Sequence, residues 1–133
     1  MKNLIIIISL FLFSLNSDSQ VDIKLKNDYL LKGKLITKID KLIPQCGILA
    51  WATIVEFEVI YFSDSSYSEK IIPVVIACPN PYKTGLYEIG NTYELVLSSN
   101  KWDISEWVFF ESSKELLTKY DMKKHYWFSK LIK

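Results

Sequence analysis

The sequence predicts an all-β domain with one short helix, built as a small β-barrel or a strongly bent antiparallel sheet of five to seven strands. Apolar and polar residues alternate along most of the chain after residue 20, which is the period of a strand. The segment Gly47 to Phe62 is far longer than an ordinary strand, and such strands usually bend to serve two sheets or close a barrel. One stretch, Ser112 to Tyr120, carries a clear helical pattern.

The first residues have the three-part pattern of a secretory signal peptide. Lys2 precedes an apolar run over residues 4–13 that only Ser9 interrupts, and small and polar residues follow, with Ser17 and Ser19 suited to cleavage. The run is shorter than the roughly 20 residues that a membrane-spanning helix needs. We therefore expect a signal peptide over 1–19 and a single β-rich domain over 20–133, exported to the periplasm or the extracellular space. An uncleaved membrane anchor is the alternative.

The net charge of +1 conceals basic ends and an acidic middle. Lysines exceed acids over 21–43 and 112–133, whereas acids exceed lysines over 44–111. This distribution favours contact between the end strands and the middle of the chain; a basic patch for an anionic surface is the alternative. All 16 basic residues are lysines, whereas paired recognition of phosphates and bases favours arginine. We therefore expect no nucleic-acid partner.

Residues 21–40 predict two short strands around a turn at Asn27 and Asp28. The apolar positions that share a face are Val21, Ile23 and Leu25 before the turn and Leu31, Leu35 and Ile39 after it. Gly33 indicates a bulge or a close approach of another backbone.

The long segment changes character along its length. Its odd positions are apolar apart from Thr53, while its even positions change from apolar residues to Glu56 and Glu58. We expect one half to be covered on both faces and the other half to show one face to water. After a polar loop over 63–69, residues 70–78 are almost continuously apolar and predict a strand buried on both faces. Pro73 cannot donate to a ladder, so it requires an edge position or a bulge.

The remaining sequence predicts two more strands and a helix, followed by a C-terminal segment that fits either a strand or a helix. Residues 92–98 alternate cleanly, with Tyr93, Leu95 and Leu97 inward, and residues 104–111 predict a further strand. Ser112 and Glu115 predict a capping box. The helix that follows has an apolar face made of Leu116, Leu117 and Tyr120. Residues 125–133 alternate weakly and fit a closing strand or a helix.

The order of these elements resembles a known architecture. Cys46-Gly47 before the long strand, Cys78-Pro79 after the next one, and EIGNTYELVLS beyond it look like a small secreted OB-like β-barrel of the netrin-module kind, as in tissue inhibitors of metalloproteinases. They are also similar to small uncharacterised secreted proteins of flavobacteria-like bacteria. The resemblance implies a barrel but no activity. Inhibition in the named family uses a cysteine at the mature N-terminus, whereas Cys46 lies inside the mature chain.

Cys46 and Cys78 are expected to form a disulfide, as two cysteines in an exported chain usually do. If the two central strands form a hairpin, both cysteines lie at its outer end. Counting outward from Ser66 reaches Cys46 after 20 residues and Cys78 after 12, so the bridge requires a bulge near Pro73 or a curved return of the Cys46 segment. The alternative is a nucleophilic Cys78, which needs a base and a lowered pKa.

Three further observations bear on chemistry. His125 is the single histidine and is expected at the surface or half-buried, and it forms no zinc-like cluster with the cysteines. The acids of residues 103–106 fit no calcium loop, so we expect no metal, no cofactor and no catalytic residue. Glu56 and Glu58 share a strand face at a spacing that glycoside hydrolysis could use, but the solvent-exposed face of a strand is the simpler interpretation.

The loop aromatics Tyr82, Tyr87, Trp102 and Trp107 are the candidates for contact with a ligand or partner. Loops line the ligand face of OB-like barrels, and exposed aromatic rings suit sugars or proteins, although core packing explains Trp107 equally well. The sequence therefore favours an exported, non-catalytic binding or interaction domain with a protein or glycan partner. A small envelope-associated hydrolase or protease inhibitor is the alternative. Cys78 and Asn80 each precede a proline and are therefore expected to be extended.

Overall fold

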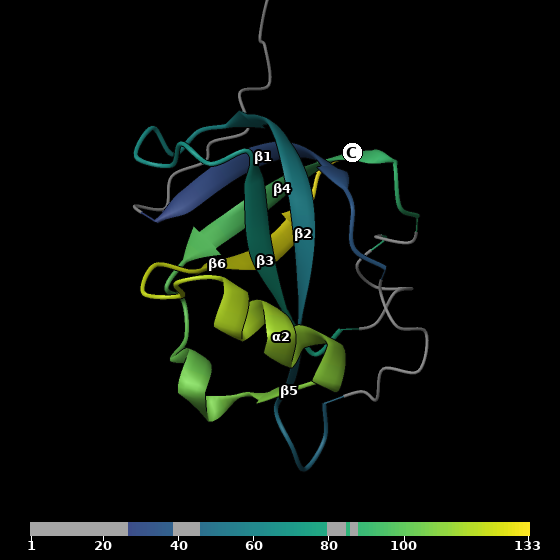
Figure 1. Ribbon diagram of the computed structural model, residues 1–133, viewed down its shortest axis with the longest axis vertical. Helices are drawn as coiled ribbons and strands as arrows, with labels where there is room; N and C mark the ends of the chain where they lie inside the picture. The colour runs from purple at the N-terminus through teal and green to yellow at the C-terminus, as the bar shows by residue number, and fades with distance from the viewer. Residues whose placement is uncertain (1–26, 39–45, 80–84, 86–87) are drawn as a thin grey trace, which may run out of the picture.

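The computed structural model describes residues 27–38, 46–79, 85 and 88–133 (Figure 1). Its strands are β1 (Asp28–Leu35), β2 (Trp51–Phe62), β3 (Ile71–Ala77), β4 (Thr92–Ser99), β5 (Val108–Phe109) and β6 (Tyr126–Leu131). Its helices are the 3-10 helix η1 (Ile104–Glu106) and the α-helix α2 (Glu111–Lys119). The expected signal peptide, the strand before Asn27, and Ile39 lie outside the described residues.

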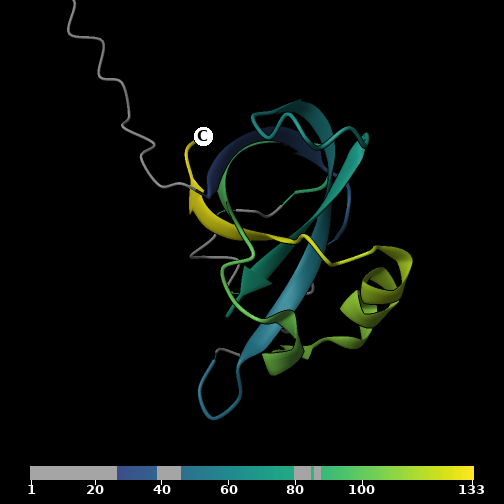
Figure 2. The same ribbon diagram turned by 90° about the vertical axis from the view of Figure 1, so that its left-hand side faces the viewer.

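Five of these strands close into a barrel, which Figure 2 shows nearly end-on. The order around it is β1, β4, β6, β3 and β2, and β2 then pairs with β1 again. β3 and β6 run parallel, and the other four pairings of the barrel are antiparallel. β5 adds a short parallel pairing at the start of β2. The predicted small all-β barrel is confirmed, and the closing segment is a strand, β6, rather than a helix.

β2 closes the barrel because different parts of its length pair with different neighbours. Residues 52–58 pair with β3, whereas the later part pairs with β1 from Phe57 onward. Val55 and Phe57 face the barrel interior, while Ala52 and Ile54 on the opposite face pack toward α2. The predicted change from two covered faces to one is therefore confirmed. The strand begins at Trp51 instead of Gly47, because residues 46–49 form a bend.

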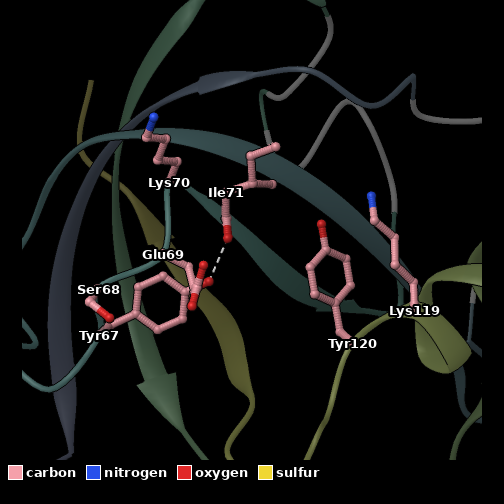
Figure 3. A pocket seen from close by; sticks show the side chains of 7 residues that line it. All are labelled: Tyr67, Ser68, Glu69, Lys70, Ile71, Lys119 and Tyr120. Carbon is pink, nitrogen blue, oxygen red and sulfur yellow. Dashed lines mark hydrogen bonds between the residues drawn. The ribbon is translucent and has the colours of Figure 1, made fainter.

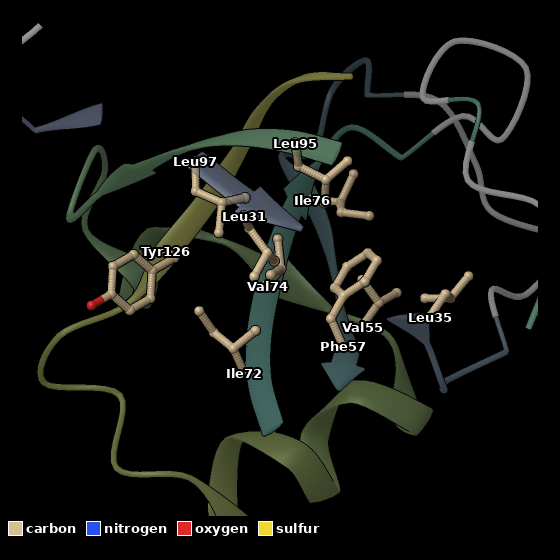
Figure 4. Close-up of a cluster of buried hydrophobic side chains, with 10 residues drawn as sticks. All are labelled: Leu31, Leu35, Val55, Phe57, Ile72, Val74, Ile76, Leu95, Leu97 and Tyr126. Atoms are coloured by element: carbon tan, nitrogen blue, oxygen red, sulfur yellow. The ribbon is translucent and has the colours of Figure 1, made fainter. Parts of the chain in front are cut away.

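Two hydrophobic clusters lie on the two faces of the sheet. The interior cluster fills the barrel (Figure 4) and consists of Leu31, Leu35, Val55, Phe57, Ile72, Val74, Ile76, Leu95, Leu97 and Tyr126. The outer cluster consists of Ala52, Ile54, Val75, Phe109 and Trp127, and Leu116 and Leu117 of α2 pack against it. Figure 1 shows α2 beside the lower part of β2 and β3, where it covers this outer face. The predicted apolar face of the helix thus stabilises the outside of the barrel.

Gly33 and Pro73 occupy positions that their chemistry requires. The register between β1 and β2 shifts at Gly33, and a Cβ atom there would lie 3.0 Å from Cβ of Phe57. The predicted bulge and close approach are both confirmed. Pro73 lies opposite Glu56, and because the Val59 N–H donates to the Lys70 carbonyl, alternation makes the Pro73 pair a non-hydrogen-bonded one. The ring nitrogen therefore faces the edge of β3 before its pairing with β6 begins, and no bulge is needed.

The strand predicted over residues 104–111 is confirmed only in part, as the two-residue β5. Its first residues form η1 instead, because the Asp103 side chain accepts from the Ser105 N–H at 3.0 Å and starts a 3-10 turn. The predicted capping box is absent. α2 begins after Phe110, which makes no side-chain capping bond, and Ser112 is exposed.

Ser113 of α2 is buried and makes hydrogen bonds to β2. It is 1% exposed, and its Oγ accepts from the Ile54 N–H at 2.9 Å and lies 3.0 Å from Oγ1 of Thr53. We expect Ser113→Ala to lower the free energy of unfolding by about 1 to 3 kcal/mol, because the buried Ile54 N–H loses its acceptor. Chemical denaturation measures this loss.

Ser112→Ala is the matched control, since it makes the same chemical change one residue earlier at an exposed position. It should leave stability unchanged within about 0.5 kcal/mol. Equal losses in the two variants would contradict the assignment of Ser113.

No helix among the described residues combines the length and the apolar character needed to span a membrane.

Candidate functional site

Cys46 and Cys78 form a disulfide, with their Cα atoms 5.0 Å apart. The ladder between β2 and β3 has no register shift, so the curved return of the Cys46 segment resolves the unequal spacing. The Trp51 N–H points to Sγ of Cys46 at 3.3 Å, and the Cys78 N–H donates to the Trp51 carbonyl at 2.8 Å. Cys78 is thus a structural residue in this state and not a free nucleophile.

The backbone of Cys78 differs from the expectation. Its φ is +50°, in the left-handed region, whereas the proline that follows predicted an extended residue. The chain leaves β3 at this residue while the Cys78 N–H still bonds to β2 and its side chain bonds to Cys46. The hydrogen bond and the disulfide together keep the Cys78 backbone in this left-handed conformation. Asn80, which was also expected to be extended because Pro81 follows it, lies outside the described residues.

Glu56 is a bonded carboxylate rather than a solvent-exposed one. It accepts hydrogen bonds from the Tyr120 hydroxyl, from Nζ of Lys119 at 2.9 Å and from Oγ1 of Thr37 at 2.9 Å. Burial alone would raise the pKa of Glu56, but these hydrogen bonds outweigh it and hold the pKa below its usual value. Glu58 is exposed, as expected. The pair therefore combines an engaged, ionised carboxylate with a solvated one.

His125 is buried, at 8% exposure, whereas the sequence predicted a surface or half-buried residue. Its Nδ1 lies 2.9 Å from the Met122 carbonyl and its Nε2 lies 3.0 Å from the Trp102 carbonyl. Both ring nitrogens thus face backbone oxygens and connect two turns of the chain. Among the described residues, no group of three or more His, Cys, Asp or Glu side chains is arranged to hold a metal ion.

Trp102, Trp107 and Trp127 form a tryptophan cluster outside the barrel. Their ring centroids lie 5.0 to 5.4 Å apart, and Trp127 is fully buried beneath the other two. Trp102 is 39% exposed, and Nζ of Lys101 lies 4.3 Å from the centroid of its ring. The structure therefore brings together two of the predicted contact residues, Trp102, which is partly exposed, and Trp107, which packs against the outer cluster. The other two, Tyr82 and Tyr87, lie outside the described residues.

A groove that the sequence did not reveal lies between the loop before β3 and the end of α2 (Figure 3). It has a volume of about 510 Å³. We call it the tyrosine groove, and its lining consists of Tyr67, Ser68, Glu69, Lys70, Ile71, Lys119 and Tyr120. Only Tyr67 gave a local signal, as a single aromatic residue in a polar loop.

Asp64 anchors the loop on one side of this groove. It is 6% exposed, and its Oδ2 accepts from Nζ of Lys124 at 2.6 Å and from the Tyr126 hydroxyl at 2.7 Å. Its Oδ1 accepts from the backbone N–H and the hydroxyl of Ser66. Burial alone would raise the pKa of Asp64, but the hydrogen bonds from Lys124, Ser66 and Tyr126 outweigh it and place the pKa far below its usual value. The loop is thereby fixed to the start of β6.

The two tyrosines of the groove are held by their hydroxyl groups. The Tyr67 hydroxyl donates to the Ile71 carbonyl at 2.5 Å, and the Tyr120 hydroxyl donates to Glu56. Burial, assisted by nearby Tyr120 and Glu69, raises the pKa of Tyr67 to about 12. Burial and the bond to Glu56 also raise the pKa of Tyr120. Both hydroxyls therefore stay protonated at neutral pH and keep their rings in place.

Known proteins provide no assignment for these surfaces. No protein-family model, no curated protein and no solved structure matches this chain. Its function must be inferred from the geometry.

Proposed function

We propose that this protein is an exported, non-catalytic binding domain that takes its ligand in the tyrosine groove. The observation that carries the proposal is a concave site whose aromatic walls are already fixed by hydrogen bonds from Tyr67 and Tyr120. Ligand sites are typically concave, apolar and largely preformed, with a few polar groups at fixed positions. The groove is open to solvent, but its two rings are preformed, its rim carries polar groups, and its volume lies within the usual range of ligand pockets.

Export is supported by the disulfide, because such bonds persist mainly in oxidising compartments. The resemblance to OB-like barrels adds support for binding through loops. The hydrolase or inhibitor alternative draws less support from the described residues. Glu56 is ionised and has three partners, which leaves it unsuited as a general acid, and Cys78 is bonded to Cys46.

The test is nuclear magnetic resonance of the isotope-labelled, disulfide-bonded protein with two separate probe pools, one of oligosaccharides and one of short peptides. At least one pool should shift the backbone signals of residues 67–71, 119 and 120. Trp102→Leu is the matched variant, because it removes the exposed ring of the tryptophan cluster and leaves the groove unchanged. The groove shifts should persist in it. Failure of both pools to shift the groove, or shifts confined to the indole signals of the tryptophan cluster, would refute the proposed site.

A further inference from the structure

We infer that the tyrosine groove is a carbohydrate site for a neutral pyranose sugar, an inference that rests on the proposed function and specifies its ligand. The first support is the presentation of the aromatic rings. In Figure 3 the rings of Tyr67 and Tyr120 are seen broadside on either side of Ile71. An aromatic face is electron-rich, and the C–H groups on one face of a pyranose carry partial positive charge. The two surfaces are therefore complementary in shape and in polarity.

The second support is that both rings are positioned before a ligand arrives. The Tyr67 hydroxyl is bonded to the Ile71 carbonyl, and the Tyr120 hydroxyl is bonded to Glu56. Tyr67 also makes T-shaped contacts with Phe62 and Tyr126, with ring centroids 5.6 and 5.8 Å away. A site whose side chains are already ordered loses less entropy on binding, which leaves more of the contact energy for affinity. A fixed pair of rings meets this condition.

The third support is the chemistry of the groove rim. Ser68, Glu69 and Lys70 are exposed and make no side-chain hydrogen bond or ion pair with the residues that the structure describes. They offer a hydroxyl, an acceptor carboxylate and a donor ammonium group. The charges of Glu69 and Lys70 balance, and Lys119 is balanced by Glu56 at 2.9 Å. A neutral ligand whose hydroxyls both donate and accept matches this rim better than an anion or a cation does.

A peptide fits the same surface less well. Peptides often bind by adding a strand to an open sheet edge, and the start of β3 next to the groove is such an edge. Here the Ile71 carbonyl already accepts from the Tyr67 hydroxyl, and Pro73 has no N–H to offer. Successive ladder positions are thus closed to a partner strand.

The test is saturation-transfer NMR on the disulfide-bonded protein with the methyl glycosides of glucose, galactose, mannose and N-acetylglucosamine as probes. At least one glycoside should receive saturation from tyrosine aromatic protons, chiefly at its ring C–H protons. Tyr67→Leu should weaken its binding about tenfold, because a stacked aromatic ring is lost. Tyr67→Phe keeps the ring but loses the hydroxyl that holds it, so it should weaken binding by about threefold, less than Tyr67→Leu does.

Variants at the rim keep the test independent of folding. Glu69→Gln and Lys70→Met change exposed side chains, and each should weaken binding about threefold to tenfold through the loss of a charged hydrogen-bonding group. Trp102→Leu should leave the affinity unchanged. Absence of transfer to all four glycosides, or tighter binding of trigalacturonate than of any neutral glycoside, overturns the inference. If the peptide pool still shifts the groove in that case, the proposed function stands and only the sugar is excluded.

Discussion

Replacing both Cys46 and Cys78 by serine is expected to lower the free energy of unfolding by about 3 to 4 kcal/mol. The two residues lie 32 positions apart, and in the chain-entropy model a cross-link over a loop of that size restricts the unfolded chain by this amount. The barrel interior does not include either cysteine, so the loss should arise mainly from the unfolded state. Denaturation in urea at neutral pH measures it.

Reduction provides the control for this substitution. A thiol reductant should lower the stability of the original protein by the same amount and should leave the double variant unchanged. The bend over residues 46–49 should also become more susceptible to proteolysis in both cases, because its attachment to β3 is lost. A loss below about 1 kcal/mol would show that the unfolded chain is already restricted without the bond.

Asp64→Asn is expected to lower the free energy of unfolding by about 2 to 4 kcal/mol at neutral pH. The carboxylate accepts four hydrogen bonds, from Ser66, Lys124 and Tyr126, and an amide cannot replace the charged ones. Because Nζ of Lys124 can return to water, the loss lies below that of a fully buried ion pair. Glu69→Gln, in the same loop but exposed, should leave stability unchanged within about 0.5 kcal/mol.

The effect of Asp64 should depend on pH in a definite direction. Its pKa is lowered in the folded state, so its contribution is present above the unfolded value of about 3.9. That contribution is lost as the pH falls below about 4 toward the folded pKa. The difference in stability between the original protein and Asp64→Asn should therefore shrink between about pH 5 and pH 2. A constant difference over this range would contradict the assigned role.

The sequence predicted the strands well wherever burial alone sets the residue pattern. β4 alternates because one face lies in the barrel, and the first half of β2 is apolar on both faces because the interior and α2 cover it. The positions of Gly33 and Pro73 were also predictable, because the missing side chain of glycine and the missing N–H of proline are properties of the residue itself. The disulfide followed from the expected export and from the positions of Cys46 and Cys78, although the bend that joins them was only one of two options.

The site was less predictable because it depends on polar contacts between distant residues. Glu56 looked solvent-exposed, since the period of a strand cannot show that Tyr120 and Lys119, more than 60 residues later, would bond to it. Asp64 also looked like an ordinary residue of a polar loop, because its partners Lys124 and Tyr126 are distant in the sequence. The groove joins Tyr67 to Tyr120 only after the barrel closes, whereas Trp102 and Trp107 were near enough in sequence to be considered together.

The way in which α2 meets β2 also bears on solubility. Between its pairing with β5 and its pairing with β1, β2 would present unpaired backbone N–H groups, and such an edge is a template for strands of other molecules. Oγ of Ser113 accepts from Ile54 and Oγ1 of Thr37 accepts from Glu56. Two hydroxyl groups thus occupy positions that an invading strand would need. Ser113 from α2 and Thr37 from the chain after β1 thus leave these two N–H groups of β2 unavailable, so we expect this edge to resist pairing with a strand of another molecule.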